Sequence, residues 1–389
     1  MHSGVNTIHQ LEPAAEWTAD PAVHPAWIEV DLGRLEQNLA RVRAITGDAA
    51  IIASVKANAY GHGVLAVSRT LERAGCEMLA TGSFREAVAL RDGGVNLPIL
   101  MFGHCLPQAY PALIRKNLIP TLHAPGQAEA LNEAAGQHTV DAFIKVDAGL
   151  GRLGYPIDTA EAAIIEMARL PRLSLKGLYT HLPFSTSAQR DQVRDRFARF
   201  AELVARLRRK GIEFEFVQAN ASAGLLSGLE GPFNAVCPGH ALYGLDPGAE
   251  PLAASNGIEP ILRGLRARLV QVGAPNGGGS GPSDGYGSAA SAKRRGVVPI
   301  GQAQGLTSAG VSNRQEVLVG GRRLQVVGIS FEHAVVDLND SDAVAGDVVT
   351  FIGCDGEDSI SIQEFAHWRG GTIKDALSAI SGRLGEIFL

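Results

Sequence analysis

Several features that mark whole classes of protein are scarce in this chain of 389 residues. It has no basic block, with Lys+Arg 35 against Asp+Glu 40 and a net charge of −5, so we expect no nucleic-acid partner. The 4 cysteines lie far apart without metal-ligand spacing, which favours reduced thiols in a cytoplasm and no metal site. With 46% apolar and 19% charged residues, the chain has the composition of a globular protein.

An apolar segment long enough for a membrane anchor is also missing from the N-terminus. Residues 1–25 carry acidic residues and prolines without an apolar core, so we predict a flexible tail and no membrane association. No GxGxxG follows an early strand, which counts against an open, doubly wound sheet as the alternative fold.

What the chain does contain is an alternation of short apolar runs with amphipathic segments over residues 26–260. This spacing predicts parallel β/α units, and the number of runs suits a closed (β/α)₈ barrel of the TIM type. The predicted strands are Trp27–Val30, Ile51–Val55, Met78–Thr81, Pro98–Phe102, Ile119–Leu122, Val140–Val146, Leu175–His181 and Phe214–Ala219.

Residues 261–389 have a different pattern, with short valine- and glycine-rich segments separated by turns. This pattern predicts a mostly-β domain that ends in a weakly helical segment, Ile373–Leu384. The fold class is therefore α/β, with an N-terminal barrel and a C-terminal β domain.

Lys56 directly follows one predicted strand, in the stretch VKANAYGHG (Val55 to Gly63). An unpaired ammonium group at a strand end is costly to bury, unless the amine forms a Schiff base with an aldehyde cofactor. The alternative is a lysine whose stem packs on the sheet while its amine stays in water.

Polar residues also lie at or just after the ends of three other predicted strands. Because functional residues of β/α barrels lie at the C-terminal ends of the strands, we expect these side chains to converge. They are Lys145, Asp147 and Arg152 in IKVDAGLGRLG, His181 in YTHL, and Asn220 in VQANASAG. A surface cation, a buried core histidine and a turn asparagine are the alternatives for Arg152, His181 and Asn220.

These motifs resemble the alanine racemase family of pyridoxal-phosphate (PLP) enzymes, in the family's order along nearly the whole chain. VKANAYGHG resembles the family's PLP-lysine motif. KVDAGLGRLG resembles KxDxGMGRxG, which implies that Arg152 contacts the cofactor hydroxyl and pairs with Lys145, a lysine that is often carbamylated in that family. THLPFS resembles the strand end whose histidine, here His181, orients a catalytic tyrosine.

The resemblance also implies how the cofactor is held. VCPGHALYG resembles VRPGIxLYG, in which Gly239 and His240 offer backbone N–H groups to the phosphate and Tyr243 belongs to the same segment. Tyr60 and a hydroxyl near Asn220 complete this site. Ala221 stands where the family has its serine, so Ser222 is the candidate hydroxyl.

The catalytic tyrosine of the family corresponds to Tyr286, in DGYGSAAS. In that family the tyrosine enters the neighbouring subunit's active site, so a homodimer with shared sites is implied. Lys56 and Tyr286 would act as bases on opposite faces of the substrate, and His181 would assist a phenol whose ordinary pKa is about 10.

The chain departs from the family pattern around the substrate. Cys237 replaces the arginine that bonds the pyridine nitrogen, and a thiol is a weak donor without fixed charge. Gln302 and Gln304 replace a tyrosine and an aspartate, and Gly382 stands where a gate tyrosine is expected. The altered segment Ser330-Phe331-Glu332 places Phe331 and Glu332, with Gln302 and Arg152, at the substrate.

The resemblance therefore implies an isomerase, a PLP-dependent racemase acting on alanine or, because gate tyrosines are missing, on a larger amino acid. Two alternatives remain open at this point. One is another PLP reaction on the same fold, namely decarboxylation, retro-aldol cleavage or transamination. The other is a catalytically silent PLP-binding protein.

Overall fold

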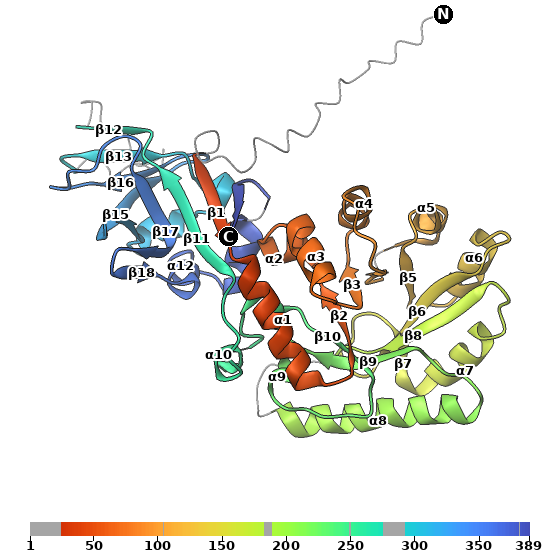
Figure 1. Ribbon diagram of the computed structural model, residues 1–389. Helices are drawn as coiled ribbons and strands as arrows, with labels where there is room; N and C mark the ends of the chain where they lie inside the picture. The colour runs from red at the N-terminus through yellow and green to blue at the C-terminus, as the bar shows by residue number, and fades with distance from the viewer. Residues whose placement is uncertain (1–24, 104, 183–188, 249, 275–291, 381) are drawn as a thin grey trace, which may run out of the picture. The chain divides into compact units, whose positions relative to one another are not determined.

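The structure is a computed structural model that describes residues 25–103, 105–182, 189–248, 250–274, 292–380 and 382–389. These residues form two compact units (Figure 1): residues 31–261, and residues 262–389 together with the N-terminal strand that precedes residue 31. Tyr286 and all but the last residue of the predicted tail lie outside the described residues.

The first unit is a closed barrel of eight parallel strands. Neighbouring strands pair in the order β2-β3-β4-β5-β6-β8-β9-β10, and β10 pairs back onto β2. The strands are β2 (Ala50–Ser54), β3 (Met78–Thr81), β4 (Ile99–Met101), β5 (Ile119–Leu122), β6 (Val140–Asp147), β8 (Leu173–Tyr179), β9 (Phe216–Ala221) and β10 (Ala235–Cys237). A short strand, β7 (Tyr155–Pro156), pairs with β6. The predicted barrel is confirmed.

Helices connect successive barrel strands, and Figure 1 shows α3 to α8 arranged around the outside of the barrel. The helices of this unit are α1 (Leu32–Thr46), α2 (Lys56–Gly61), α3 (Val64–Arg73), α4 (Phe84–Asp92), α5 (Tyr110–Arg115), α6 (Gln127–Ala134), α7 (Ile157–Met167), α8 (Arg190–Arg209), α9 (Ser222–Leu226) and α10 (Leu252–Ser255), with 3₁₀ turns η1 (Pro107–Ala109) and η3 (His240–Tyr243). Asp31 begins α1, because its carboxylate accepts the Arg34 N–H at 2.9 Å.

The barrel interior is filled by side chains from successive strands. One buried cluster takes members from most of the barrel strands: Ile52, Met78, Ala80, Leu100, Ile119, Phe143, Tyr179 and Ala235. The ring of Phe143 lies directly against Gly177 of β8, where a β-carbon would be 2.1 Å from the ring. Burying such a ring contributes about 2–3 kcal/mol, so Gly177 matters because it leaves room for Phe143.

The second unit is a curled sheet with the strand order β12-β13-β16-β15-β14-β17-β11-β1-β19, and β18 pairs with β17. The strands are β1 (Ala26–Val30), β11 (Leu262–Arg268), β12 (Gln271–Gly273), β13 (Arg295–Val298), β14 (Glu316–Val319), β15 (Arg322–Ile329), β16 (Ala334–Asp337), β17 (Val348–Asp355), β18 (Asp358–Ile360) and β19 (Gly385–Phe388). The helical elements are η6 (Gln302–Gln304), α11 (Ser308–Ser312), α12 (Ile362–Trp368) and α13 (Ile373–Ile380). The mostly-β C-terminal region is confirmed.

One strand prediction was wrong. The run Trp27–Val30 was expected in the barrel, but β1 pairs antiparallel with β11 and parallel with β19. The eighth barrel strand is instead β10, only three residues long, in the segment that contains Cys237. Alternation along the chain indicates where strands occur, but the partner of each strand is decided by contacts between distant segments.

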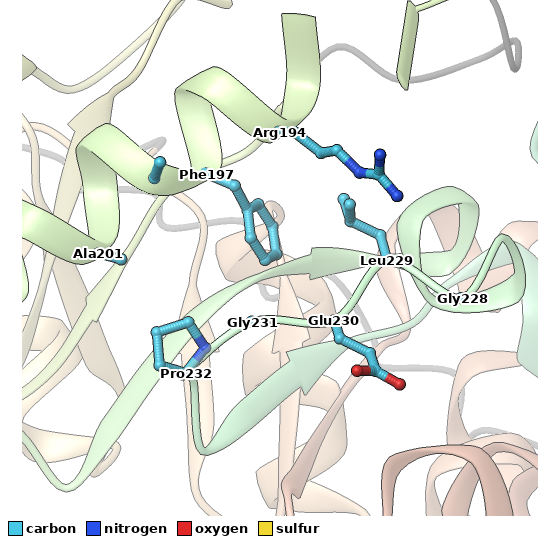
Figure 2. A pocket seen from close by; sticks show the side chains of 9 residues that line it. Arg194, Phe197, Ala201, Gly228, Leu229, Glu230, Gly231 and Pro232 are labelled. Carbon is cyan, nitrogen blue, oxygen red and sulfur yellow. The ribbon is translucent and has the colours of Figure 1, made fainter. Parts of the chain in front are cut away.

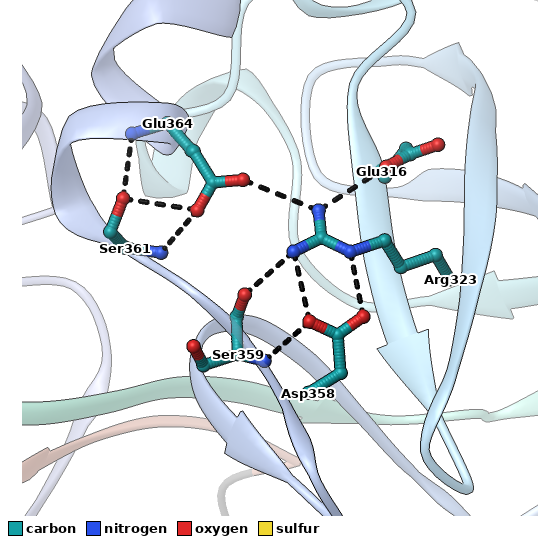
Figure 3. A network of polar contacts seen from close by, with 6 residues as sticks. All are labelled: Glu316, Arg323, Asp358, Ser359, Ser361 and Glu364. Carbon is teal, nitrogen blue, oxygen red and sulfur yellow. Dashed lines mark hydrogen bonds and ion pairs between the residues drawn. The ribbon is translucent and has the colours of Figure 1, made fainter.

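A polar network around Arg323 joins four elements of the second unit (Figure 3). The Arg323 guanidinium forms ion pairs with Asp358 of β18 at 2.7 Å and with Glu316 and Glu364 at 3.3 Å each. These carboxylates raise the pKa of Arg323, the bond to Asp358 most of all. Because the pairs are partly exposed, the network orders the surface of this unit more than it stabilises the fold.

Candidate functional site

Lys56 begins a turn of unusual handedness at the end of β2. The four residues after it, Ala57 to Tyr60, all have left-handed backbone angles, with φ between 53° and 55°. Residues other than glycine adopt this conformation at a cost of about 1–2 kcal/mol each. Such strain persists only where surrounding contacts hold it, and it is concentrated at functional sites.

Hydrogen bonds accepted by Asn58 stabilise the turn. Its carbonyl accepts the His62 N–H at 2.9 Å, and its side-chain Oδ1 accepts the Val64 N–H at 2.8 Å. The Ala59 N–H donates to the Val55 carbonyl at 3.0 Å, which ties the turn to the end of β2. These bonds place Lys56 and Tyr60 on one short, rigid segment.

The Lys56 amine lies among groups that disfavour its charged form. Although its side chain has exposed surface, nearby protein displaces enough water that desolvation lowers its pKa, and the charge of Arg152 lowers it further. Its Nζ is 5.6 Å from the centroid of the Tyr60 ring. A lysine with a depressed pKa is a better nucleophile and a better base near neutral pH.

Lys145, at the end of β6, is more deeply buried. Only 5% of its surface is exposed, and its Nζ lies 5.5 Å from the centroid of the Tyr179 ring. Desolvation, together with the charges of Arg152 and Lys56, lowers the pKa of Lys145 to about 8. A substantial fraction of this amine is therefore uncharged near pH 8, which is the form that reacts with carbon dioxide.

Asp147 orders the loop that carries Arg152. Its carboxylate accepts backbone N–H groups from Gly149, Leu150 and Gly151 at 2.8–2.9 Å. Burial alone would raise the pKa of Asp147, but these bonds lower it below its ordinary value. The guanidinium of Arg196 from α8 packs against Gly149 of this loop.

His181 follows β8 and is half-buried. Desolvation, followed by the charges of Arg152, Lys145 and Lys56, lowers the pKa of His181 to about 4. The imidazole is therefore neutral near pH 7. The structure thus brings the polar residues of three strand ends within electrostatic reach of one another.

A cradle of hydroxyl and backbone groups lies beside Lys56, where β10 leads into η3. A β-carbon on Gly239 would be 2.3 Å from the Tyr60 hydroxyl, so this hydroxyl occupies the space that glycine leaves open. Buried Ser222 accepts the N–H groups of Gly239 and Ala241 at 3.0 and 3.1 Å. The Tyr60 ring contacts the rings of Tyr243 and His240, with centroids 4.8 and 5.3 Å away.

The residues of this cradle fit a phosphate group, because hydroxyls and main-chain amides are the donors that bind anions. The Oγ atom of Ser222, a predicted phosphate ligand, accepts the Gly239 N–H. Tyr243 has a supporting position, with its hydroxyl donating to the Ser54 carbonyl at 2.9 Å. The amide of Asn220 donates to the Leu229 carbonyl at 2.6 Å, which fixes the chain after β9.

Cys237 ends β10 and packs against the cluster inside the barrel. Desolvation raises the pKa of its thiol to about 12, although the Lys56 charge opposes this. The thiol is therefore protonated and neutral near pH 7. The position that carries an arginine in the family pattern thus contributes no fixed charge here.

Three further candidates, Gln302, Phe331 and Glu332, lie in the second unit and are exposed. The Gln302 and Ala303 N–H groups donate to the carbonyls of Ser330 and Phe331 at 3.0 and 2.8 Å, so the two segments lie side by side. Phe331 has 66% of its surface exposed, which is unusual for a phenylalanine. Gly382, where the resemblance implies a gate tyrosine, is exposed and has a left-handed φ of 76°.

Two residues of the site were not singled out from the sequence. Tyr179 lies beneath the Lys145 amine, and its hydroxyl is 3.2 Å from that of Thr121. Glu86 of α4 accepts the Asn58 N–H at 2.8 Å. Tyr179 belongs to the YTHL motif, so the sequence contained a signal for it. Glu86 lies in a Ser-x-x-Glu motif that is common at helix starts, so the sequence contained no sign of its contact with Asn58.

A separate surface pocket of about 340 Å³ lies beside the first half of α8 (Figure 2). Phe197 and Leu229 supply its apolar wall, and Arg194 and Glu230 also line it. Lys56, Lys145, Arg152 and His181 do not, so this pocket is distinct from the cluster at the strand ends.

Other kinds of site find little support in the described part of the chain. No group of three or more His, Cys, Asp or Glu residues there could hold a metal ion. No helix in those ranges is long and apolar enough to cross a membrane. The cysteines, all of which are described, are free thiols.

Comparison with known proteins agrees along nearly the whole chain. Residues 30–247 match the model of the alanine racemase N-terminal domain, and residues 265–388 match that of the C-terminal domain. Alanine racemase of Methanococcus maripaludis is 30% identical over 377 residues, covering 94% of this chain and 99% of that protein. Alanine racemase of Geobacter sulfurreducens is 33% identical over 381 residues, covering 94% and 97%.

Solved structures give the same result. The Bacillus anthracis alanine racemase with bound L-Ala-P is 27% identical, with a TM-score of 0.83, covering 94% of this chain and 95% of that one. The Clostridium difficile 630 alanine racemase in complex with cycloserine is 25% identical, with a TM-score of 0.82 and the same coverage.

Proposed function

This chain belongs to the alanine racemase family, and from that membership we propose that it interconverts the L- and D-forms of alanine or of a larger amino acid. Its class is that of a PLP-dependent isomerase. The observation that carries the proposal is the placement of Lys56, whose amine has a lowered pKa and lies among Arg152, Lys145 and His181 beside a phosphate-binding cradle.

Pyridoxal phosphate, when bound, supplies an aldehyde that binds the lysine amine and an aromatic ring that acidifies the α-proton of an amino acid. In the proposed site Lys56 holds the cofactor. The hydroxyls of Tyr60 and Ser222, with the backbone of His240 and of Gly239, would hold its phosphate, the Gly239 N–H exchanging its bond to Ser222 Oγ for one to the phosphate. Arg152 contacts the cofactor hydroxyl, and carbamylated Lys145 neutralises and orients Arg152.

Racemisation requires a base on each face of the substrate's α-carbon. Lys56 Nζ takes or returns the proton on one face. The oxygen of Tyr286 of the partner subunit would do so on the other face, taking the proton as the phenolate and returning it as the phenol, so a homodimer with shared sites is part of the proposal. Neutral His181 accepts a hydrogen bond from that hydroxyl and orients it, because a nitrogen with a pKa of about 4 stays available as an acceptor.

Arg152 is proposed to bind the substrate carboxylate, and Phe331, Glu332 and Gln302 are proposed as further substrate-binding residues. Exposed Gln302 and Gly382 lack the phenol rings of the family pattern, which supports a wider entrance and a larger side chain than that of alanine. The free state of all four thiols supports a cytoplasmic location.

The test is exchange of the α-proton in D₂O, followed by NMR, across a panel of L- and D-amino acids with the PLP-loaded protein. Exchange together with loss of optical activity, abolished by Lys56→Ala, is the expected result and names the substrate. Exchange without inversion would contradict the two-base mechanism. Consumption of an amino acid to a different product, or no exchange with any member of the panel, would contradict racemisation.

A further inference from the structure

The left-handed turn that carries Lys56 is held from a neighbouring β/α unit. Glu86, in the first turn of α4, directs its carboxylate Oε1 to the Asn58 N–H at 2.8 Å. The first N–H groups of any helical turn lack partners within the turn, and Asn58 lies at its beginning. A half-buried carboxylate therefore satisfies a donor in the most strained backbone of the site.

Glu86 is itself fixed in place. Its second oxygen, Oε2, accepts the hydroxyl of Thr81 at 2.6 Å, and Thr81 is completely buried at the end of β3. Its backbone N–H donates to Ser83 Oγ at 3.2 Å, which begins α4. A short charge-assisted bond on each oxygen leaves this side chain little freedom.

The sequence around Glu86 predicts a different role. Ser83 and Glu86 have the Ser-x-x-Glu spacing of a capping box, in which the glutamate bonds the N–H of the first residue. Ser361 and Glu364 of α12 have the same spacing, and there the Ser361 N–H donates to Glu364 Oε2 at 2.9 Å. At α4 the Ser83 N–H instead donates to the Thr81 hydroxyl at 3.3 Å, so Glu86 is free to reach Asn58.

The geometry points to Glu86 as a positioning residue, which holds the Ala57–Tyr60 turn and thereby sets the places of the Lys56 amine and the Tyr60 hydroxyl. This inference rests on the proposed function in so far as those two groups hold the cofactor. Glu86 does not touch the reacting atoms. Its effect passes through the backbone of Asn58, and small displacements of an active-site group lower rates steeply.

The test uses two readouts on the full-length protein: peptide exchange is measured with and without PLP, and PLP attachment is measured on protein from which PLP has first been removed. Hydrogen–deuterium exchange of the peptide spanning residues 55–64 reports how firmly the turn is held. Borohydride reduction followed by peptide mass spectrometry gives the rate at which added PLP attaches to Lys56. The variants are Glu86→Ala, Glu86→Gln and Thr81→Val.

Glu77→Ala is the matched control. Glu77 also bonds a backbone N–H of the same chain segment, because its Oε2 accepts the Ile51 N–H at 2.9 Å, but this bond lies at the opposite end of β2. Removing Glu77, which also pairs with Arg43, tests the general effect of losing a partly buried side-chain acceptor of a backbone N–H without touching the turn.

We expect Glu86→Ala to slow PLP attachment by roughly 10-fold and to speed exchange in the 55–64 peptide by a similar factor. Glu86→Gln keeps an oxygen for the Asn58 N–H and should stay within about 3-fold of the native protein. Thr81→Val should change both readouts in the same direction as Glu86→Ala but less. Glu77→Ala should lower the unfolding midpoint and leave both readouts unchanged.

Native values of both readouts in Glu86→Ala, or equal changes in Glu77→Ala, would overturn the inference. If Glu86→Ala does not fold, unchanged readouts in Thr81→Val overturn it instead. Failure of the native protein to attach PLP at Lys56 would overturn the proposed function, while exchange of the 55–64 peptide would still decide the role of Glu86.

Discussion

The hydroxyl of Tyr60 lies 2.3 Å from the place where a β-carbon of Gly239 would stand. These residues come from opposite ends of the barrel sequence, one after β2 and the other after β10, and β2 and β10 are neighbouring strands. The contact brings a phenol, a serine hydroxyl and backbone amides together beside Lys56. Position 239 therefore requires glycine because a larger side chain would collide with the Tyr60 hydroxyl, and not because of its backbone angles.

Gly239→Ala should weaken PLP binding, because the added methyl group forces the Tyr60 hydroxyl out of the cradle. We expect the dissociation constant to rise by roughly 10-fold, the equivalent of one lost hydrogen bond to a charged group. Fluorescence titration with PLP measures it. Gly273→Ala is the control, because a β-carbon there meets no atom within 4 Å. Unchanged affinity in Gly239→Ala would contradict the assignment of the cradle.

Stability should fall as the pH is lowered from about 6.5 to 4. Desolvation lowers the pKa of both His62 and His181 to about 4, while in the unfolded chain each titrates near 6.5. The unfolded state therefore binds more protons in this window, so stability present above pH 6.5 is lost as the pH falls. For fully buried His62 the loss is about 3 kcal/mol.

Urea unfolding at several pH values, without added PLP, measures this dependence. His62→Gln should lower by about one the number of extra protons that the unfolded chain binds relative to the folded chain. The free energy of unfolding should then depend less steeply on pH between pH 4 and 6.5. A slope that is the same in the native protein and in this variant would show that His62 titrates normally in the fold.

Lys145 should form a carbamate when bicarbonate is present. Its pKa of about 8 leaves an uncharged amine at mildly alkaline pH, and nearby Arg152 stabilises the resulting negative charge. With ¹³C-labelled bicarbonate, we expect a carbamate carbon signal in NMR that grows as the pH rises through 8. Lys145→Met should lack it. A persistent signal in Lys145→Met would assign the carbamate to another amine, and no signal in the native protein would disprove the modification.

The cysteines should differ in their reactivity toward iodoacetamide. Desolvation raises the pKa of Cys237 to about 12 and that of Cys76 to about 11, so both are almost wholly thiols at pH 8. Exposed Cys354 should be labelled first. Peptide mass spectrometry over time measures the order, and denaturation in urea should abolish the differences. Early labelling of Cys237 would show that it carries a charge in the site after all.

Local patterns in the sequence were sufficient for much of the architecture. The alternation of apolar runs and amphipathic segments predicted a (β/α)₈ barrel followed by β structure, because each element must bury one apolar face. The position of Lys56 directly after a buried strand was also evident. Since parallel strands end on the same side of a barrel, the meeting of Lys56, Lys145, Arg152 and His181 could be predicted without coordinates.

What the sequence determined by itself was thus the kind of each element and the strand ends that carry chemistry. Only the tertiary structure decided the pairing of β1 with β11 and β19, the closure of the barrel by β10, and the left-handed turn after Lys56. It also decided that Glu86 reaches Asn58 while Glu364, in the same motif, caps its own helix. Several local arrangements have similar energies, and contacts between distant segments decide which one forms. A local sequence pattern therefore cannot predict the choice.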